Sequence, residues 1–163
     1  MHAIILTLFI MIFTFVYGTL AGYVVHWLLH TPMFERLAKA HNTHHELYTP
    51  DDFVSETYRD AKNNDSVFVF VPIITTAIAL ACIPLWFLFS TWWIYPIIIA
   101  LGASVGWLND HMHEAFHIIN HPYNKYNYFL KLKHLHLMHH MHPKKNHGII
   151  WFGPDKLFRT FAD

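Results

Sequence analysis

Histidine is the residue type in this sequence whose spacing points most directly to chemistry. Sixteen of the 163 residues are histidine, more than lysine and arginine together. Spacings of one, three and four residues place the rings of each cluster on one face of a helix. Grouped imidazoles repel one another when protonated but bind a metal ion when neutral. The ten clustered residues, predicted as metal ligands, are His26 and His30; His41, His44 and His45; His113 and His117; and His136, His139 and His140.

Ten imidazoles exceed the ligand set of one ion. First-row metals take four to six ligands, so ten histidines predict two metals sharing one site. The single cysteine, Cys82, excludes a cysteine-based zinc or iron–sulfur site. Asp110 and Glu114 are candidates to orient ligands by accepting the second ring N–H. Further histidines near the clusters, whose roles as extra ligands or supporting residues stay open, are His111, His134, His142 and His147.

The third cluster also allows a different chemistry. Residues 113–117 read HEAFH, the H-E-x-x-H pattern of zinc metalloproteases. A protease of that type would leave the other three clusters without a role. A ferritin-like di-iron site needs two Glu-x-x-His words and further glutamates, whereas the chain has one such word and four glutamates in all. A membrane metal-binding or transport protein remains the principal alternative to an enzyme.

The composition predicts a membrane protein. Hydrophobic residues make up 54% and charged residues 13% of the chain, against about 25% charged in soluble domains. No charged residue occurs from Ala3 to Val25 or from Ser66 to Leu108. The second stretch is long enough for two crossings, with a break expected at Ser90 and Thr91. We therefore expect membrane spans at about residues 3–25, 66–89 and 92–108.

The charged residues define the rest of the architecture. All lysines and arginines lie in 31–65 and 109–163, and three spans place these segments on the same side, which the positive-inside rule makes the cytoplasm. The predicted fold is all-α: one domain, 1–163, in which a membrane helical bundle carries a cytosolic helical cap formed by 26–65 and 109–163. The net charge of zero gives no indication of nucleic-acid binding.

The order H-x3-H, H-x2-HH, H-x3-H, H-x2-HH resembles the fatty acid hydroxylase superfamily, which includes sterol desaturases and carotenoid hydroxylases. The stretches NDHMHEAFH, KLKHLHLMHHMHPKKNHG and GPDKLFRT also resemble motifs of that family. The similarity runs from His26 to about Thr160. Two positions depart from the pattern, since His147 replaces an aromatic residue and Arg159 replaces a glycine.

This resemblance implies a function. It implies that the ten histidines hold two iron ions, with zinc as an alternative metal, and that oxygen from O2 is inserted into a C–H bond of a fatty acyl, sterol or carotenoid lipid. Hydroxylation and desaturation both remain open. The sequence contains no flavin or Rossmann fingerprint and no iron–sulfur ligand set, so a separate ferredoxin, cytochrome b5 or reductase is expected to supply electrons.

Overall fold

The computed structural model describes residues 2–59, 69–84 and 94–163. These residues form helices and connecting loops, with no named β-strand among them, so the all-α prediction is confirmed. The long helices are α1 (His2–Leu29), α2 (Glu35–Leu47), α3 (Phe70–Ala81), α5 (Ile94–Phe116) and α6 (Asn127–Met141). The short elements are α7 (Gly153–Leu157) and the 3-10 turns η1 (Pro32–Phe34), η2 (Pro50–Asp52) and η4 (Pro122–Lys125).

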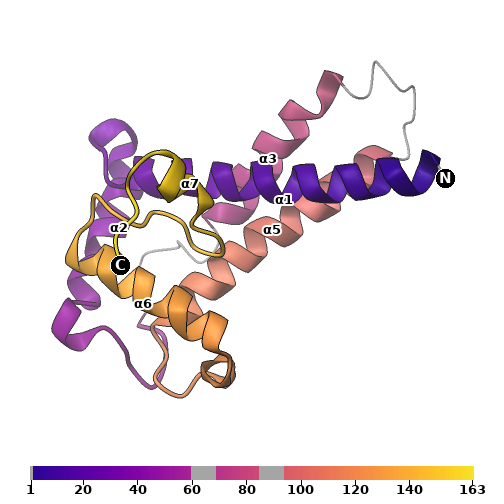
Figure 1. The fold of residues 1–163 in the computed structure, drawn as a ribbon. Coiled ribbons are helices and arrows are strands. Elements are labelled where there is room, and N and C mark those ends of the chain that lie inside the picture. Colours follow the sequence, from indigo (N-terminus) through magenta and orange to yellow (C-terminus); the bar gives the residue numbers. More distant parts are fainter. Residues whose placement is uncertain (1, 60–68, 85–93) are drawn as a thin grey trace.

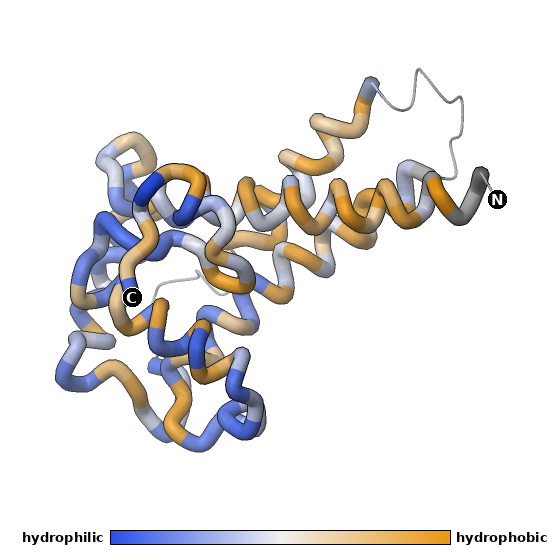
Figure 2. Tube along the Cα trace, viewed as in Figure 1, coloured by the Kyte–Doolittle hydropathy of each residue, from blue (hydrophilic) through white to orange (hydrophobic). Residues whose placement is uncertain are grey.

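The helices separate into a rod and a cap. Helices α1, α3 and α5 pack against one another and form an elongated bundle, whereas α2, α6 and α7 gather at one end of it (Figure 1). Hydrophobic residues dominate the rod and hydrophilic residues are concentrated in the cap (Figure 2). The chain passes between the two parts along α1 and α5, which reach from the rod into the cap.

Helix α1 has the length and composition of a membrane span. Its segment Thr7–Leu29 contains 23 residues and, within the described ranges, is the one helix both long and apolar enough to cross a bilayer. Large apolar side chains are exposed along it, including Leu8 and Ile12, which is 65% exposed. A continuous exposed apolar surface of this kind is typical of contact with lipid. This result agrees with the first expected span.

Helices α3 and α5 are held together by close backbone contact as well as by side chains. An ideal Cβ on Gly106 would lie 2.6 Å from the Cα of Val71, so only glycine fits at this position without a shift of α3. The isoleucines Ile74, Ile78 and Ile98 are at most 1% exposed and fill the contact between the two helices. The pairing is therefore tight and almost entirely apolar.

The other expected spans are only partly described. Within 66–89, the described helix is α3, which has 12 residues, and the expected break at Ser90 and Thr91 lies outside the described residues. Within 92–108, α5 begins at Ile94 but does not end near Leu108; it continues to Phe116. The expected boundary between span and cap is therefore not a helix end. The side chain of Asn109 bonds its own helix at the Val105 carbonyl, 2.8 Å away, so polar residues here do not interrupt α5.

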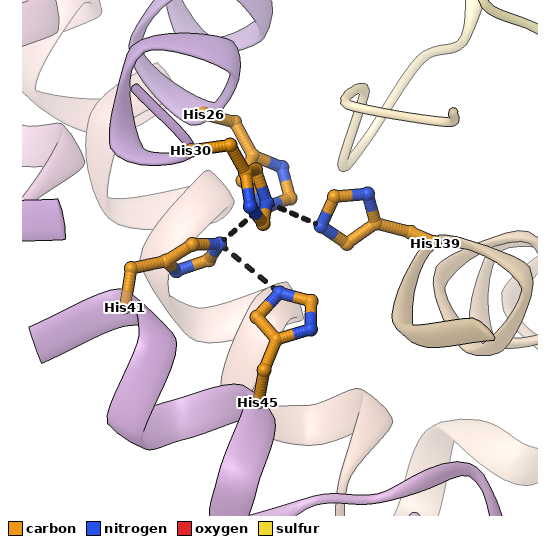
Figure 3. A group of neighbouring side chains, drawn as sticks. All are labelled: His26, His30, His41, His45 and His139. Atoms are coloured by element: carbon orange, nitrogen blue, oxygen red, sulfur yellow. Dashed lines mark hydrogen bonds between the residues drawn. The ribbon is translucent and has the colours of Figure 1, made fainter. Parts of the chain in front are cut away.

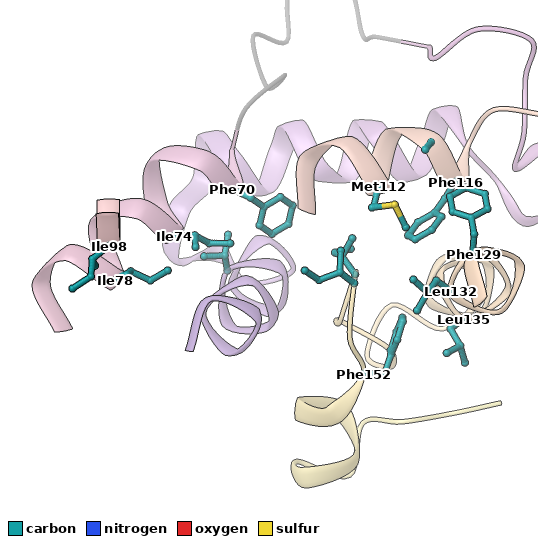
Figure 4. Close-up of a cluster of buried hydrophobic side chains, with 14 of the residues drawn as sticks. Phe70, Ile74, Ile78, Ile98, Met112, Phe116, Phe129, Leu132, Leu135 and Phe152 are labelled. Carbon is teal, nitrogen blue, oxygen red and sulfur yellow. The ribbon is translucent and has the colours of Figure 1, made fainter. Parts of the chain in front are cut away.

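The apolar core of the rod continues into the cap. Phe116 at the end of α5 packs against α6 through Phe129, Leu132 and Leu135, and Phe152 from the C-terminal segment joins the same cluster (Figure 4). All five side chains are buried. This cluster fixes the end of α5 beside α6 and so positions the third histidine cluster near the fourth.

Candidate metal centre

The four histidine clusters meet where four helices end. His26 lies in the last turn of α1 and His30 follows that helix directly, and the third cluster is placed in the same way on α5. The fourth cluster lies within the last two turns of α6. The second cluster occupies the C-terminal half of α2. Because the C-terminal end of a helix carries a partial negative charge, four such ends around one space favour a bound cation.

Five of the ten histidines form a first group, which we call cluster A. Their candidate donor nitrogens all lie within 4.8 Å of one another, and Figure 3 shows the rings turned toward a common space. The Nε2 atom of His30 lies 3.0 Å from that of His139 and 3.0 Å from that of His41. The members of cluster A are His26, His30, His41, His45 and His139.

Four further histidines form cluster B, namely His44, His117, His136 and His140. The Nε2 atom of His136 lies 3.1 Å from that of His117 and 3.2 Å from that of His140. The tenth predicted ligand, His113, belongs to neither group, but its ring centroid lies 4.6 Å from that of His44 and 4.7 Å from that of His136. The structure thus brings all ten predicted residues together.

The nitrogen separations fit coordination to metal ions. Imidazole nitrogens bind first-row metals at about 2.1 Å, so two ligands on one ion lie about 3.0 Å apart at a right angle and about 3.4 Å apart at a tetrahedral angle. The observed Nε2 separations within the clusters, from 3.0 to 3.2 Å, fall in this range. The two clusters are adjacent, since the rings of His45 and His140 stack at 4.1 Å.

Backbone carbonyls set the orientation of four of these rings. The Nδ1–H groups donate to carbonyls: His26 to His147 at 2.8 Å, His117 to Phe53 at 2.8 Å, His139 to Lys145 at 2.6 Å and His140 to Tyr48 at 2.7 Å. A carbonyl can only accept, so the proton resides on Nδ1 and each neutral ring directs an Nε2 lone pair into the centre. This is the tautomer that a metal requires.

Burial keeps the rings in the neutral, ligand-competent form. It lowers the pKa of His44, His136 and His139 well below the ordinary value of 6.5, and the positive charges of neighbouring histidines lower the pKa of each further. Burial also lowers the pKa of His113 to about 3 and that of His140 to about 4. Buried Nε2 atoms of His44 and His113 have no hydrogen-bond partner among the described residues, as expected for atoms that bind a metal.

The expected role of Asp110 is wrong. Its carboxylate accepts hydrogen bonds from the backbone N–H groups of Phe70 and Val71, at 3.2 and 3.1 Å. These N–H groups begin α3 and have no partner within that helix, so the acidic side chain satisfies them. The carbonyls described above do the orienting instead. Neither cluster contains a carboxylate, so Glu114 is not among the grouped donors.

The remaining histidines fall into two kinds. His111 stacks on Trp107 at 4.9 Å, and His134 and His142 are exposed on the cap. His121 caps η4, where its ring accepts a hydrogen bond from the N–H of Tyr123. His147 differs from these, because it is 1% exposed and lies beside cluster A. The sequence left the role of His147 open. The only indication in the sequence was that His147 stands where the family pattern has an aromatic residue.

A small cavity reaches the centre between α1, α2, α3 and α5. Its volume is about 50 Å³. The apolar part of its wall includes Leu29, Leu37 and Phe70, whereas His41, His44 and His113 face it from the metal side. Tyr58 and Asp110 also line the cavity, and its volume suits O2 or the end of a hydrocarbon chain.

The described residues thus define a class of helical proteins with a long apolar helix and a buried polyhistidine site able to hold a metal. The sequence model of the fatty acid hydroxylase family matches residues 9–160. The chain therefore belongs to the fatty acid hydroxylase family, which confirms the resemblance drawn from its motifs. No curated protein and no solved structure gives a significant match.

Family membership establishes the general activity. The family comprises membrane-associated, generally iron-dependent hydroxylases and desaturases, so this chain is an oxidoreductase of lipid metabolism. The histidine clusters described above are able to bind the metal that such chemistry uses. The metalloprotease interpretation of HEAFH finds no support, because His117 is grouped with three histidines from other helices whereas His113, the other histidine of the motif, belongs to neither group.

Proposed function

We propose that this protein is a multi-pass membrane di-iron monooxygenase that inserts one atom of O2 into a C–H bond of a lipid. The observation that carries the proposal is the pair of adjacent clusters whose Nε2 lone pairs are directed inward by backbone carbonyls. Ten imidazoles would supply five ligands for each of two ions, with His113 joining cluster B. Zinc could occupy the same ligand set, but it offers no redox chemistry.

The bound iron pair would supply the redox chemistry that activates O2. The second oxygen atom leaves as water, with two electrons and two protons delivered from outside. The chain contributes by holding its ligands in one tautomer and by excluding water. His26, His117 and His136 are fully buried and the Tyr48 ring covers that of His117 at 4.0 Å, so the site is shielded from water on that side.

The lipid would approach from the bilayer side of the centre. The cavity wall contains Leu29 at the end of α1 and Phe70 at the start of α3, the points at which the apolar rod meets the cap. A hydrocarbon chain lying beside the rod would therefore reach the metal-facing side of the cavity without crossing water. A polar headgroup would remain at the level of the cap. The fatty acyl, sterol and carotenoid classes are all compatible with this arrangement.

The cap would face the cytoplasm, where a separate ferredoxin, cytochrome b5 or reductase delivers electrons. The basic residues of the chain support this orientation, because all follow His30 and lie in the two cap segments. Protease accessibility in sealed membrane vesicles tests it directly: a cap loop such as η2 should be cleaved only when its side of the vesicle is exposed to protease.

The central experiment measures iron and product together. Purified protein should contain about two irons per chain, as two groups of five imidazoles require. Lipids from cells that express the protein should contain an oxidised species by mass spectrometry, and this species should disappear in His140→Ala. The matched control is His134→Ala, an exposed histidine on the same helix. A fully active His140→Ala variant, or one iron or fewer in well-folded wild type, would refute the proposal.

A further inference from the structure

His147 is a buried histidine whose ring nitrogens lack the partners that buried polar atoms need. Its side chain is 1% exposed, and both Nδ1 and Nε2 are without a hydrogen-bond partner among the described residues. Burial lowers the pKa of this ring to about 4, and the nearby Lys144 carbonyl offsets only part of that lowering. An unpaired buried polar group is costly, so a histidine retained here calls for a ligand.

The surroundings of this ring identify the ligand as a cation. The His147 ring centroid lies 5.3 Å from that of His139, 5.7 Å from that of His30 and 5.8 Å from that of His26. Established members of cluster A show the same spacing, since His26 and His30 are 5.7 Å apart. Tyr23 packs edge-on against the opposite side at 5.6 Å. The ring thus borders cluster A, outside the set of donor atoms that lie within 4.8 Å of one another, and a small shift of the ring would be needed for it to join them.

Several hydrogen bonds fix the loop that carries His147, and this loop also contacts ligands of the centre. The carboxylate of Asp155 accepts the backbone N–H groups of His147 and Gly148, each at 2.8 Å. A Cβ on Gly148 would lie 2.7 Å from that carboxylate, so glycine is required there. Asn146 adopts a positive φ of 54° and its side chain bonds the carbonyls of Leu135 and Ala162 at 3.1 and 2.7 Å.

The same loop orients two ligands of cluster A. The backbone carbonyl of Lys145 receives the Nδ1–H of His139, and that of His147 receives the Nδ1–H of His26. A movement of the loop that took the His147 ring away from cluster A would therefore also release two ligands. The His147 ring is held in place by the contacts that organise the centre, which makes it a fixed rather than an adaptable neighbour.

We propose that His147 is an eleventh metal ligand, the sixth imidazole of cluster A; this inference rests on the proposed two-metal function. Six ligands would saturate the metal of cluster A, whereas five at cluster B leave a position for O2. The two ions would then differ in role: the ion in cluster A would be held most firmly, and the ion in cluster B would be the open one.

The test replaces His147 with phenylalanine, which keeps a ring of similar size without nitrogen. Cobalt(II) would be loaded into the wild type and His147→Phe in place of iron, and titrated against a chelator. We expect the dissociation constant of one of the two ions to rise at least about tenfold and the visible absorption of cobalt to intensify as that ion loses its sixth ligand. In contrast, the melting temperature of the metal-free protein should not fall, because two unpaired buried atoms are removed.

A second variant distinguishes loss of a ligand from misfolding, and a control variant shows the effect of replacing a histidine outside the centre. His147→Ala leaves a space that free imidazole can fill, so added imidazole should restore the wild-type cobalt spectrum. His142→Phe, on an exposed position nearby, should match the wild type. Identical chelator titrations and spectra for wild type and both His147 variants would overturn the inference while leaving the two-metal function standing. Wild type that binds no cobalt or iron would instead refute the proposed function itself.

Discussion

The α3–α5 contact and the histidine centre are both buried helical interfaces, but they are complete to different degrees. In the α3–α5 contact, isoleucines such as Ile74 and Ile98 meet across closely spaced backbones, and among the described residues the buried side-chain atoms without a partner lie elsewhere. In the centre, several imidazole nitrogens, including those of His44 and His113, are buried without one. The α3–α5 contact is therefore satisfied by apolar packing, whereas the centre has donor atoms able to bind a cation.

The difference between the two regions should have its largest effect on folding stability at acidic pH. Burial lowers the pKa of the clustered histidines, so they remain neutral in the folded protein but protonate below about pH 6.5 when it unfolds, and stability therefore falls as pH falls. Each histidine that stays neutral in the folded state should remove about 1.4 kcal/mol of stability per pH unit below that value. Examples are His41, His44, His117, His136, His139 and His140.

Thermal melts of the metal-free protein at pH 7.5, 6.5 and 5.5 check this prediction. The melting temperature should already fall between the first two values, because the unfolded histidines are half protonated at pH 6.5, and should fall about three times as far between the second and the third. Helical signal from α3, which contains no histidine, should persist longest. A melting temperature that does not change down to pH 5 would show that the centre is not a neutral buried cluster. Metal-loaded protein should show the same direction of change, since protons compete with the metal for Nε2.

The next largest effect should come from Asp155, which supports the centre without touching it. Its carboxylate is fully buried and also accepts the hydroxyl of Thr160 at 2.8 Å. Asp155→Ala leaves the N–H groups of His147 and Gly148 unpaired and should cost about 2 to 4 kcal/mol, with metal affinity lower by about 10- to 100-fold. Asp155→Asn, which keeps one acceptor oxygen, should lose less stability and less metal affinity.

Thermal melting measures the loss of stability and metal titration measures the loss of affinity. Unchanged metal affinity in Asp155→Ala would contradict the supporting role of the loop.

A change in the rod should affect stability without affecting metal binding. Gly106→Ala places a Cβ against the backbone of α3 and should cost about 1 to 3 kcal/mol through overpacking. Iron per folded chain should stay at the wild-type value. Ser104→Ala, at an exposed position of the same helix, is the control and should change neither quantity. Loss of iron from folded Gly106→Ala protein would mean that the rod and the centre are not separable.

The smallest effect is expected for Glu114→Gln. Neither cluster includes this carboxylate, so kcat/KM for lipid oxidation should change by less than about threefold. A metalloprotease would lose its general base and with it all turnover. The measurement is oxidised lipid per mole of iron. A decrease of more than 100-fold in kcat/KM would show that Glu114 takes part in catalysis.

Local periodicity allowed the ligands to be predicted, whereas the partners of their rings could not be. Spacings of three and four place His136, His139 and His140 on one face of α6 wherever that helix lies. By contrast, the carbonyls of Tyr48 and Phe53 that orient His140 and His117 come from distant loops. Every residue has a carbonyl, so composition carries no signal of which one will be used. Asp110 was expected in that role because its chemistry suits it, but the start of α3 competes for it.

The sequence by itself determined that this chain is helical, that it carries an apolar segment long enough to span a bilayer and that its histidines are grouped for metal binding, because helix periodicity and hydrophobicity are local properties. Only the tertiary structure decided how the ten histidines divide into clusters A and B, that α5 continues unbroken into the cap, and that His147 lies beside cluster A rather than in solvent. Those outcomes depend on which helix ends meet, and that is set by packing between residues as far apart as His26 and His147.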